Sequence, residues 1–403
     1  QAPVELNAVV KEEERSRSEY VSNISIHNIT AEELKAIPMP VEKDILRSLR
    51  TVPGISTSSD VSGQFFVRGG SGDQNLILYD NFIVYNPFHA LGLFSIFDGN
   101  NIKNFEIQTG GFDPEYGGKL SSVLNITTKD GNRNYYNGDV RLGMLSAHAG
   151  VNGPIPYGTI NLSIRKSLFD NIYKKFVKQD VPLSFYDMTG KVTVDFTESG
   201  KISFHYFGSG DNLMRTETED PEYKWRCNAY SFNFQSFIKE FLFTSSYSYS
   251  DYENTKKYSS GEYGKDALNQ LSTGRLNIKA EYLFDNNDIL STGLSVHSTY
   301  SRYDAYNGYG VAIFFGGNIN DIGLWLRYKY TGLPNATIDI GARYDRLSAA
   351  NDNQSDKYSF SSANRNVIEP RVNVKYKISD DISVKGSFTR MHQSVISTQN
   401  END

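Results

Sequence analysis

Apolar and polar residues alternate with a period of two from about residue 136 to the end of the sequence. In a clear case, Ile160, Leu162 and Ile164 are separated by Asn161 and Ser163. A period of two places the apolar residues on one face of a β-strand. The same pattern recurs at residues 191–196, 202–206, 232–234, 241–243, 276–282, 290–296, 322–326, 338–340, 372–376 and 382–384. This stretch is therefore predicted to be mainly β, with about thirteen strands.

The composition removes several classes of protein. No run approaches the ~18 apolar residues that a membrane-spanning helix needs. The single cysteine, Cys227, cannot close a disulfide within the chain, and a net charge of −6 argues against a general nucleic-acid binder. A large β-rich protein remains, either a soluble sandwich or a transmembrane barrel. Barrel strands escape hydropathy analysis because only alternate residues face lipid.

Loop lengths and aromatic residues favour the barrel. The expected connections alternate between short ones, at 152–158, 197–201, 239–240, 285–288, 331–335 and 379–381, and long ones, at about 169–187, 208–227, 251–273, 298–318 and 346–366. Tight turns on one side and long loops on the other are typical of outer-membrane barrels. Aromatic residues near strand ends fit an interfacial girdle: Tyr247, Tyr249, Tyr282, Phe284, Tyr328, Tyr330, Tyr344 and Tyr376.

The phase of the alternation reverses near residue 145. A tight hairpin at Leu145-Ser146 explains the reversal, because a one-residue shift exchanges the two faces of a strand. It gives a first strand near 136–144 and a second near 147–151. About thirteen strands is an odd number, whereas single-chain bacterial barrels have an even one. We therefore expect an incomplete barrel, in which the strand near 382–392 has a free edge.

Two different stretches precede the alternation. Residues 1–20 are interpreted as a flexible polar arm, with a mixed run of charges at 11–19. Residues 21–131 are predicted to form a small α+β domain. Its expected helices cover 31–37 and 41–50, and its short strands cover 64–68, 76–79, 102–109 and 122–128. Residues 136–403 are the predicted part of the barrel.

Residues 66–75, Phe-Val-Arg-Gly-Gly-Ser-Gly-Asp-Gln-Asn, resemble the first plug signature of TonB-dependent outer-membrane receptors. Further similar motifs lie at 76–80, 84–87, 107–111 and 115–126, and Glu-Pro-Arg at 369–371 opens a strand as in such barrels. The motifs cover most of 41–131 in the expected order. The resemblance implies a plug inside a 22-stranded barrel, in the outer membrane of a Gram-negative bacterium.

The resemblance also implies a function. Members import a scarce ligand, such as a siderophore, vitamin, glycan or peptide, and their partners are outer-membrane lipid and the periplasmic protein TonB. TonB adds a strand to a short N-terminal box of the receptor. The segment 4–10 is similar to such a box, with Val4, Leu6, Val9 and Val10 as candidate contacts, and a plain disordered arm is the alternative. No catalytic set, metal site or cofactor is expected, so the protein is predicted not to be an enzyme.

The sequence departs from the family at residues 109–111. Many members carry Arg-Gly-Pro there, and this chain reads Thr-Gly-Gly. In the family that arginine often pairs with barrel glutamates and locks the plug. Its absence leaves Arg68 as the plug-locking candidate, helped by Lys119, with Glu281 as the inward-facing carboxylate. We expect Arg68 to be buried and paired, because a charge in the lumen needs a partner.

Tyr85, Asn86, Phe88 and His89 form an aromatic and polar cluster in an expected plug loop. They are candidate ligand contacts, and packing within the plug core is the alternative. Two functions remain open. One is ligand import, and the other is a structural or accessory plugged barrel in a larger outer-membrane assembly, with a surface lipoprotein or another outer-membrane subunit as partner. Deletion of residues 1–12 separates them, because import needs TonB and a scaffold does not.

Overall fold

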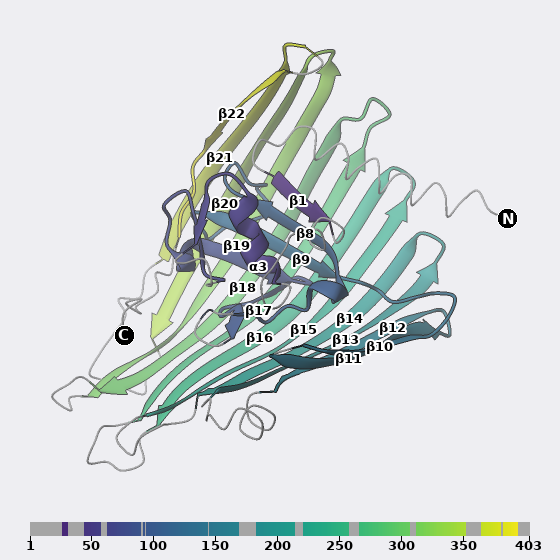
Figure 1. Ribbon diagram of the computed structural model, residues 1–403. Coiled ribbons are helices and arrows are strands. Elements are labelled where there is room, and N and C mark those ends of the chain that lie inside the picture. The colour runs from purple at the N-terminus through teal and green to yellow at the C-terminus, as the bar shows by residue number, and fades with distance from the viewer. Residues whose placement is uncertain are drawn as a thin grey trace.

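The computed structural model describes residues 26–30, 44–57, 63–89, 92, 94–143, 145–168, 183–213, 221–257, 266–306, 312–351, 364–379 and 382–393. They form a small N-terminal domain and one large curved sheet (Figure 1). The expected arm over 1–20 and the expected helix over 31–37 lie outside the described residues.

The small domain is built on a five-stranded sheet of order β1-β8-β9-β4-β5. The strands are β1 (Ile26–Thr30), β4 (Asn75–Tyr79), β5 (Phe82–Ile83), β8 (Ile102–Gln108) and β9 (Ser122–Thr128), and only β4 and β9 pair in parallel. Two antiparallel pairs accompany it, β2 (Ile55–Thr57) with β3 (Phe65–Val67) and β6 (Phe88–His89) with β7 (Phe94–Ser95). Its short helices are α3 (Ile45–Ser48), η1 (Leu49–Thr51), η2 (Gly72–Gln74) and η4 (Gly99–Asn101).

The helix α3 begins where Asp44 caps it. The Asp44 side chain accepts hydrogen bonds from the backbone N–H of Leu46 at 2.8 Å and of Arg47 at 3.3 Å, which satisfies donors that have no partner inside the helix. Leu46 and Leu49 are buried in the core of the domain. The described part of the helix expected over 41–50 is therefore a single α-turn followed by a 3₁₀ turn. The expected short strands correspond to β3, β4, β8 and β9.

Thirteen antiparallel strands form the large sheet, each bonded to its successor in the sequence. This confirms the expected number and the mainly β fold class. The strands are β10 (Asn137–Leu142), β11 (Ser146–Ile155), β12 (Gly158–Ser167), β13 (Leu183–Thr197), β14 (Gly200–Leu213), β15 (Glu222–Ile238), β16 (Phe241–Lys257), β17 (Ala267–Leu283), β18 (Ile289–Tyr306), β19 (Ala312–Leu333), β20 (Ala336–Asn351), β21 (Asn364–Lys377) and β22 (Ser383–Thr389).

The connections sort by length only in part as the sequence predicts. The strands β14 to β19 extend into the segments 208–227, 251–273 and 298–318 that are expected to be loops, and residues 307–311 between β18 and β19 are no more numerous than residues 284–288 between β17 and β18. Residues 156–157, 198–199, 239–240 and 334–335 join their strands in tight turns, whereas residues 168–182 separate β12 from β13 and residues 352–363 separate β20 from β21. The reversal of phase near residue 145 is a hairpin, with Leu142 opposite Ala147. Within the described residues β22 does not pair with β10, so each of these strands is an edge of the sheet, as expected for the strand near 382–392.

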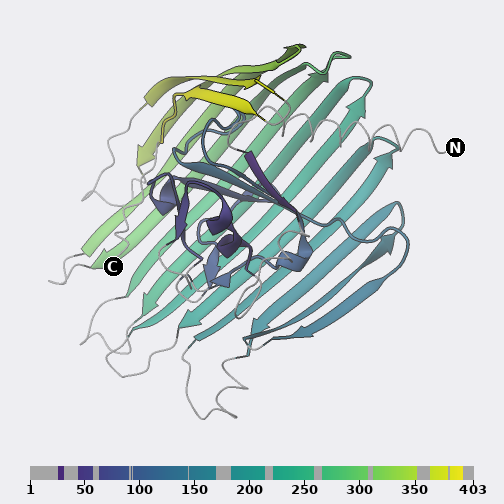
Figure 2. The ribbon, with the colours of Figure 1, turned by 45° about the horizontal axis from the view of Figure 1, so that its top comes forward.

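The two faces of the large sheet differ in polarity. Leu162 and Leu324 are exposed at 42% and 53% on one face, whereas Asn161 and Arg165 are buried on the other. Figure 2 shows the small domain lying against the inner, concave face. The outer face is thus apolar and the inner face polar, which is the pattern of a transmembrane barrel. No helix in the described part of the chain has the length and hydrophobicity to cross a membrane.

Candidate functional site

The turn between β4 and β5 inserts a carboxylate into the large sheet. Asp80 and Asn81 have φ of 40° and 75°, in the left-handed region that Asp and Asn tolerate better than most residues. Asp80 is buried, 2.9 Å from Nδ1 of His205 and 3.6 Å from Nζ of Lys191. Burial opposes the charged carboxylate, but Lys191 and His205 outweigh it and hold the pKa of Asp80 well below its usual range.

Asn81 extends this anchor to three more strands. Its carbonyl oxygen accepts hydrogen bonds from Oγ of Ser248 at 3.0 Å and from Nη1 of Arg275 at 3.1 Å. Its Nδ2 donates to Oδ1 of Asn233 at 2.7 Å. Together with the partners of Asp80, these contacts attach one two-residue turn to five neighbouring strands, β13 to β17.

His89 on β6 is enclosed between two carboxylates of the large sheet. Its Nε2 lies 2.8 Å from Oδ1 of Asp187, and its Nδ1 lies 2.7 Å from Oδ2 of Asp211. The ring stacks on Phe185 with centroids 4.3 Å apart and is 0% exposed. Burial disfavours the imidazolium, but Asp187 and Asp211 outweigh it and raise the pKa of His89 to about 9. His89 is therefore a cation at neutral pH, and both ring nitrogens donate.

Arg165 completes the buried cluster around His89. Its Nε donates to Oδ2 of Asp187 at 2.7 Å, and its Nη2 donates to the carbonyl oxygen of Ser95 at 2.6 Å. Two cations thus face the two carboxylates, so the buried charges are matched. Because Ser95 and His89 lie on β7 and β6, both strands of this pair are fixed to the large sheet.

Two arginines of the large sheet bind the backbone of the segment 111–117. Arg371 on β21 donates to the carbonyl oxygens of Phe112 at 2.9 Å and of Tyr116 at 2.7 Å. Arg343 on β20 donates to the carbonyl oxygen of Glu115 at 3.0 Å. Both arginines are 1% exposed. The large sheet therefore holds this segment through its backbone carbonyl oxygens, which accept hydrogen bonds from the planar guanidinium groups.

Carboxylates on the same two strands orient these arginines. Arg343 pairs with Asp345 at 2.7 Å, and Arg371 pairs with Glu369 at 2.6 Å. Glu369 also accepts from Nδ1 of His392 at 2.7 Å. Asp345, Glu369 and His392 bring donor atoms within 4.8 Å of one another, but the two arginines already occupy the carboxylates. These three residues therefore serve to orient the two arginines through ion pairs and hydrogen bonds.

The sequence-based plug-locking assignment needs correction. Arg68 has φ of 50° and is exposed, so the expectation that it is buried is wrong. The Nζ of Lys119 donates to the carbonyl oxygen of Asp73, within the small domain. Burial lowers the pKa of Lys119, and Asp73 partly offsets this effect. The sequence predicts a plug cation that binds barrel carboxylates. In the structure most of the cations in the contact belong to the large sheet instead.

Glu281 faces inward and is 0% exposed, as its strand phase predicts. Its neighbour in the structure is Lys279 at 3.3 Å, and Lys279 in turn reaches Glu115 of the small domain at 2.8 Å. Glu281 therefore acts on the small domain through a barrel lysine. Arg327 makes a parallel contact to Asp113 and is itself paired with Asp339 at 2.6 Å. The inward positions of Lys279, Arg327, Arg343 and Arg371 follow from the alternation, but their partners lie too far away in the sequence to be inferred.

The four candidate ligand contacts occupy different environments. The hydroxyl of Tyr85 contacts Oγ1 of Thr273, and Asn86 and Phe88 are half-buried. Phe88 packs against the core of the small domain. His89 has no exposed surface and belongs to the charge cluster with the wall. The candidate TonB contacts Val4, Leu6, Val9 and Val10 lie outside the described residues.

A sequence model of the TonB-dependent Receptor Plug Domain matches residues 18–123. The small domain therefore matches the plug domain of TonB-dependent receptors. The large sheet that surrounds it is therefore part of the barrel wall, and the resemblance found in the sequence is confirmed. TonB-dependent receptors are transporters and not enzymes. No curated protein matches the sequence.

Solved structures share this fold at low identity. The siderophore receptor PirA from Pseudomonas aeruginosa is 15% identical, with 93% of this chain and 63% of that chain covered and a TM-score of 0.66. The alcaligin receptor FauA from Bordetella pertussis is 15% identical, with 92% and 63% covered and a TM-score of 0.68. The FrpB iron transporter from Neisseria meningitidis is 13% identical, with 93% and 65% covered and a TM-score of 0.70. The chain thus spans less than two thirds of the length of these structures.

Proposed function

We propose that the protein is an outer-membrane receptor of a Gram-negative bacterium that imports a scarce ligand with energy delivered by TonB. The observation that carries this proposal is the polar character of the contact between plug and barrel. His89, Asp80 and the segment 111–117 are held by ion pairs and backbone hydrogen bonds. Water replaces such contacts one at a time, at a net cost of about 1.5–3 kcal/mol for each hydrogen bond to a charged group, so the plug can be displaced stepwise under load.

The proposal assigns a role to each part of the chain. Residues 1–20 form the arm that TonB binds, through Val4, Leu6, Val9 and Val10, by addition of a strand. Residues 21–131 are the plug, and residues 136–403 belong to the barrel. Lipid of the outer membrane covers the apolar outer face of the strands.

The ligand is proposed to be a siderophore, vitamin, glycan or peptide that reaches the plug from the long-loop side. Tyr85, Asn86 and Phe88 are its candidate contacts, since they are half-buried in a plug loop. Ferric siderophores come first in a screen, because the names of PirA and FauA give a siderophore and alcaligin as their ligands.

Deletion of residues 1–12 tests the proposal. We expect the deleted chain to assemble in the outer membrane and bind ligand, but to lose energised uptake in a strain that lacks the native copy. In a matched control, residues 1–12 stay intact and a glycine-serine linker is inserted after them. This variant changes the length of the arm and keeps the box. Normal uptake by the deleted chain would contradict TonB-driven import.

The alternative is a non-transporting plugged barrel within a larger outer-membrane assembly, bound to a surface lipoprotein or another subunit. One observation favours it, since Thr109-Gly110-Gly111 stands where many family members carry Arg-Gly-Pro. On this alternative, the deletion leaves every phenotype unchanged, and loss of the whole chain disrupts the partner's assembly.

A further inference from the structure

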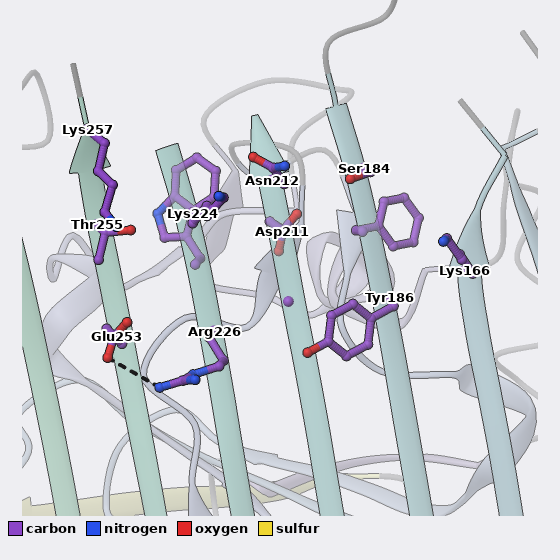
Figure 3. A pocket seen from close by; sticks show the side chains of 13 residues that line it. Lys166, Ser184, Tyr186, Asp211, Asn212, Lys224, Arg226, Glu253, Thr255 and Lys257 are labelled. Atoms are coloured by element: carbon purple, nitrogen blue, oxygen red, sulfur yellow. Dashed lines mark hydrogen bonds and ion pairs between the residues drawn. The ribbon is translucent and has the colours of Figure 1, made fainter. Parts of the chain in front are cut away.

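A cavity of about 380 Å³ opens at the ends of β12 to β16 that lead into the long connections. Figure 3 shows its side chains spread across neighbouring strands. The charged and polar residues of its lining that matter here are Lys166, Tyr186, Asn212, Lys224, Arg226 and Lys257.

These side chains point away from the plug. Asp211 on β14 binds His89 of the plug, and the buried Cys227 on β15 belongs to the core cluster of the plug. Successive side chains of a strand face opposite sides, so Asn212 and Arg226 face outward. The cavity therefore lies on the outer wall, outside the ligand path through the barrel.

One row of residues crosses the cavity directly. Tyr186 lies opposite Lys166 and Gly210, and Arg226 lies opposite Gly210 and Glu253. Gly210 has no side chain to fill the space between its two neighbours. A Cβ there would lie 2.6 Å from Cε1 of Tyr186, so the tyrosine ring leans over the glycine. The result is a hollow with an aromatic hydroxyl on one side and a guanidinium on the other.

The outer face of β15 changes in character along its length. Phe232 is 47% exposed, Tyr230 stacks on Tyr249 with centroids 5.6 Å apart, and Arg226 and Lys224 follow. From Ile238, at the short turn, to Tyr230 the strand covers about 27 Å, or about 21 Å along the membrane normal at a tilt of about 40°. That is close to the height of about 25 Å of the apolar band of such barrels, so Tyr230 marks its outer border. Arg226 lies about 13 Å further along the strand, at the level of lipid headgroups.

The hollow carries an excess of positive charge in a chain whose net charge is −6. Lys166, Lys224, Arg226 and Lys257 line it, against the outward carboxylates Glu253 and Glu222, of which Glu222 pairs with Lys224 at 3.0 Å. Arg226 reaches Glu253 at 3.3 Å with half of its side chain exposed, which is a weak pair that a stronger anion displaces. Among the described residues, Lys166 and Lys257 form no ion pair.

We infer that this hollow binds the phosphorylated headgroup of an outer-leaflet lipid, of the lipid A type. Arginine and lysine bind phosphate oxygens by charge-assisted hydrogen bonds, and the hydroxyl of Tyr186 and the amide of Asn212 supply neutral donors. The acyl chains of the same lipid lie along Phe232 and the apolar face below the tyrosines. The inference rests on the proposed function, since it takes the long-loop side of the wall as the outer leaflet.

The test measures lipid binding to the purified full chain in neutral detergent by native mass spectrometry. The probe is diphosphorylated lipid A, compared with the same lipid after removal of both phosphates. We expect the phosphorylated lipid to bind at least about tenfold more tightly. The double variant Lys224→Gln/Arg226→Gln should lose about tenfold in affinity for it. The matched control Lys239→Gln/Lys377→Gln removes two exposed charges at the short-turn end and should bind like the parent.

Several outcomes overturn the inference. Equal binding of the two lipids, or unchanged binding by Lys224→Gln/Arg226→Gln, removes the headgroup site. Complete displacement of lipid A by millimolar inorganic phosphate assigns the hollow to free phosphate. An acidic protein that co-purifies with the parent and is lost only from this variant, with lipid binding unchanged, assigns it to a protein partner. Lipid binding in detergent needs no TonB, so normal uptake by the chain that lacks residues 1–12, together with normal lipid binding, contradicts the proposed import alone.

Discussion

Arg343 of the barrel occupies the space that a side chain on Gly117 of the plug would need. A Cβ on residue 117 would overlap Nε of Arg343 and lie 2.8 Å from its Cζ. The same guanidinium donates to the carbonyl oxygen of Glu115 and is 1% exposed, so it has little room to move. The glycine of the plug and the arginine of the wall are therefore one fitted pair.

Gly117→Ala should loosen the plug in its barrel. Overpacking at a buried contact costs about 1–3 kcal/mol, and here it displaces a guanidinium that holds the plug backbone. We expect faster cleavage of the segment 111–117 by protease in the detergent-solubilised protein. Gly274→Ala is the matched control, because a Cβ there meets nothing within 4 Å. Equal protection of the two variants would contradict the fit.

Arg371→Met should release the same segment more strongly. The change removes the donors to Phe112 and Tyr116 and leaves Glu369 buried with one cation fewer, a loss of about 3–5 kcal/mol. The measurement is the denaturant concentration at which the plug becomes accessible to protease. Arg133→Met removes a pair to Asp195 from a side chain that is 56% exposed, and should lower the free energy of plug retention by less than about 1 kcal/mol. A similar shift in both variants would argue against a buried lock.

The contact of His89 with Asp187 and Asp211 should make plug retention depend on pH. Its pKa is raised to about 9 in the folded protein from 6.5, so its stabilisation is complete below pH 6.5 and is lost as the pH rises through 9. The loss amounts to about 3 kcal/mol between pH 6 and pH 10. Protease accessibility of the plug, followed across this range, measures it.

His89→Gln should abolish this dependence, because glutamine carries no titrating charge. His27→Gln is the control, since burial lowers the pKa of His27, and a lowered histidine pKa does not make stability fall as the pH rises. The same fall in plug retention from pH 6.5 to pH 10 in the His89→Gln protein would rule out the imidazolium as its cause.

Leu324→Arg should destabilise the barrel in a lipid bilayer according to depth. Leu324 is 53% exposed in the middle of β19, where an arginine facing lipid costs about 2–4 kcal/mol. Leu333 is 44% exposed at the short-turn end of the same strand, where the cost falls to about 0–1 kcal/mol. Unfolding midpoints in vesicles compare the two variants. Equal costs at both positions would indicate that this face does not meet lipid.

The period of two was sufficient to predict the number of barrel strands and the face that each residue occupies, because strand faces are set by neighbouring residues. It ended several strands too early, since β14 to β19 continue into segments expected to be loops. It also placed Glu281 on the inner face. It could not reveal the lock between plug and barrel. Arg68 follows a strand within an Arg-Gly-Gly turn, but it is exposed in the structure. Arg343 and Arg371 bind carbonyl oxygens more than 200 positions away, and no local pattern encodes such a pairing.

The two ways in which the wall holds the plug have different consequences for exchange of plugs between receptors. Arg343 and Arg371 bind main-chain oxygens, which every amino acid presents, so these contacts survive a change of side chain at residues 112 and 116 as long as residue 117 stays glycine. Asp113 and Glu115 in the same segment are also held through their side chains, by Arg327 and Lys279. The His89 cluster instead requires one particular side chain opposite Asp187 and Asp211. A plug transplanted from a distant receptor would thus keep the main-chain contacts at the first site and leave two buried carboxylates short of a cation at the second.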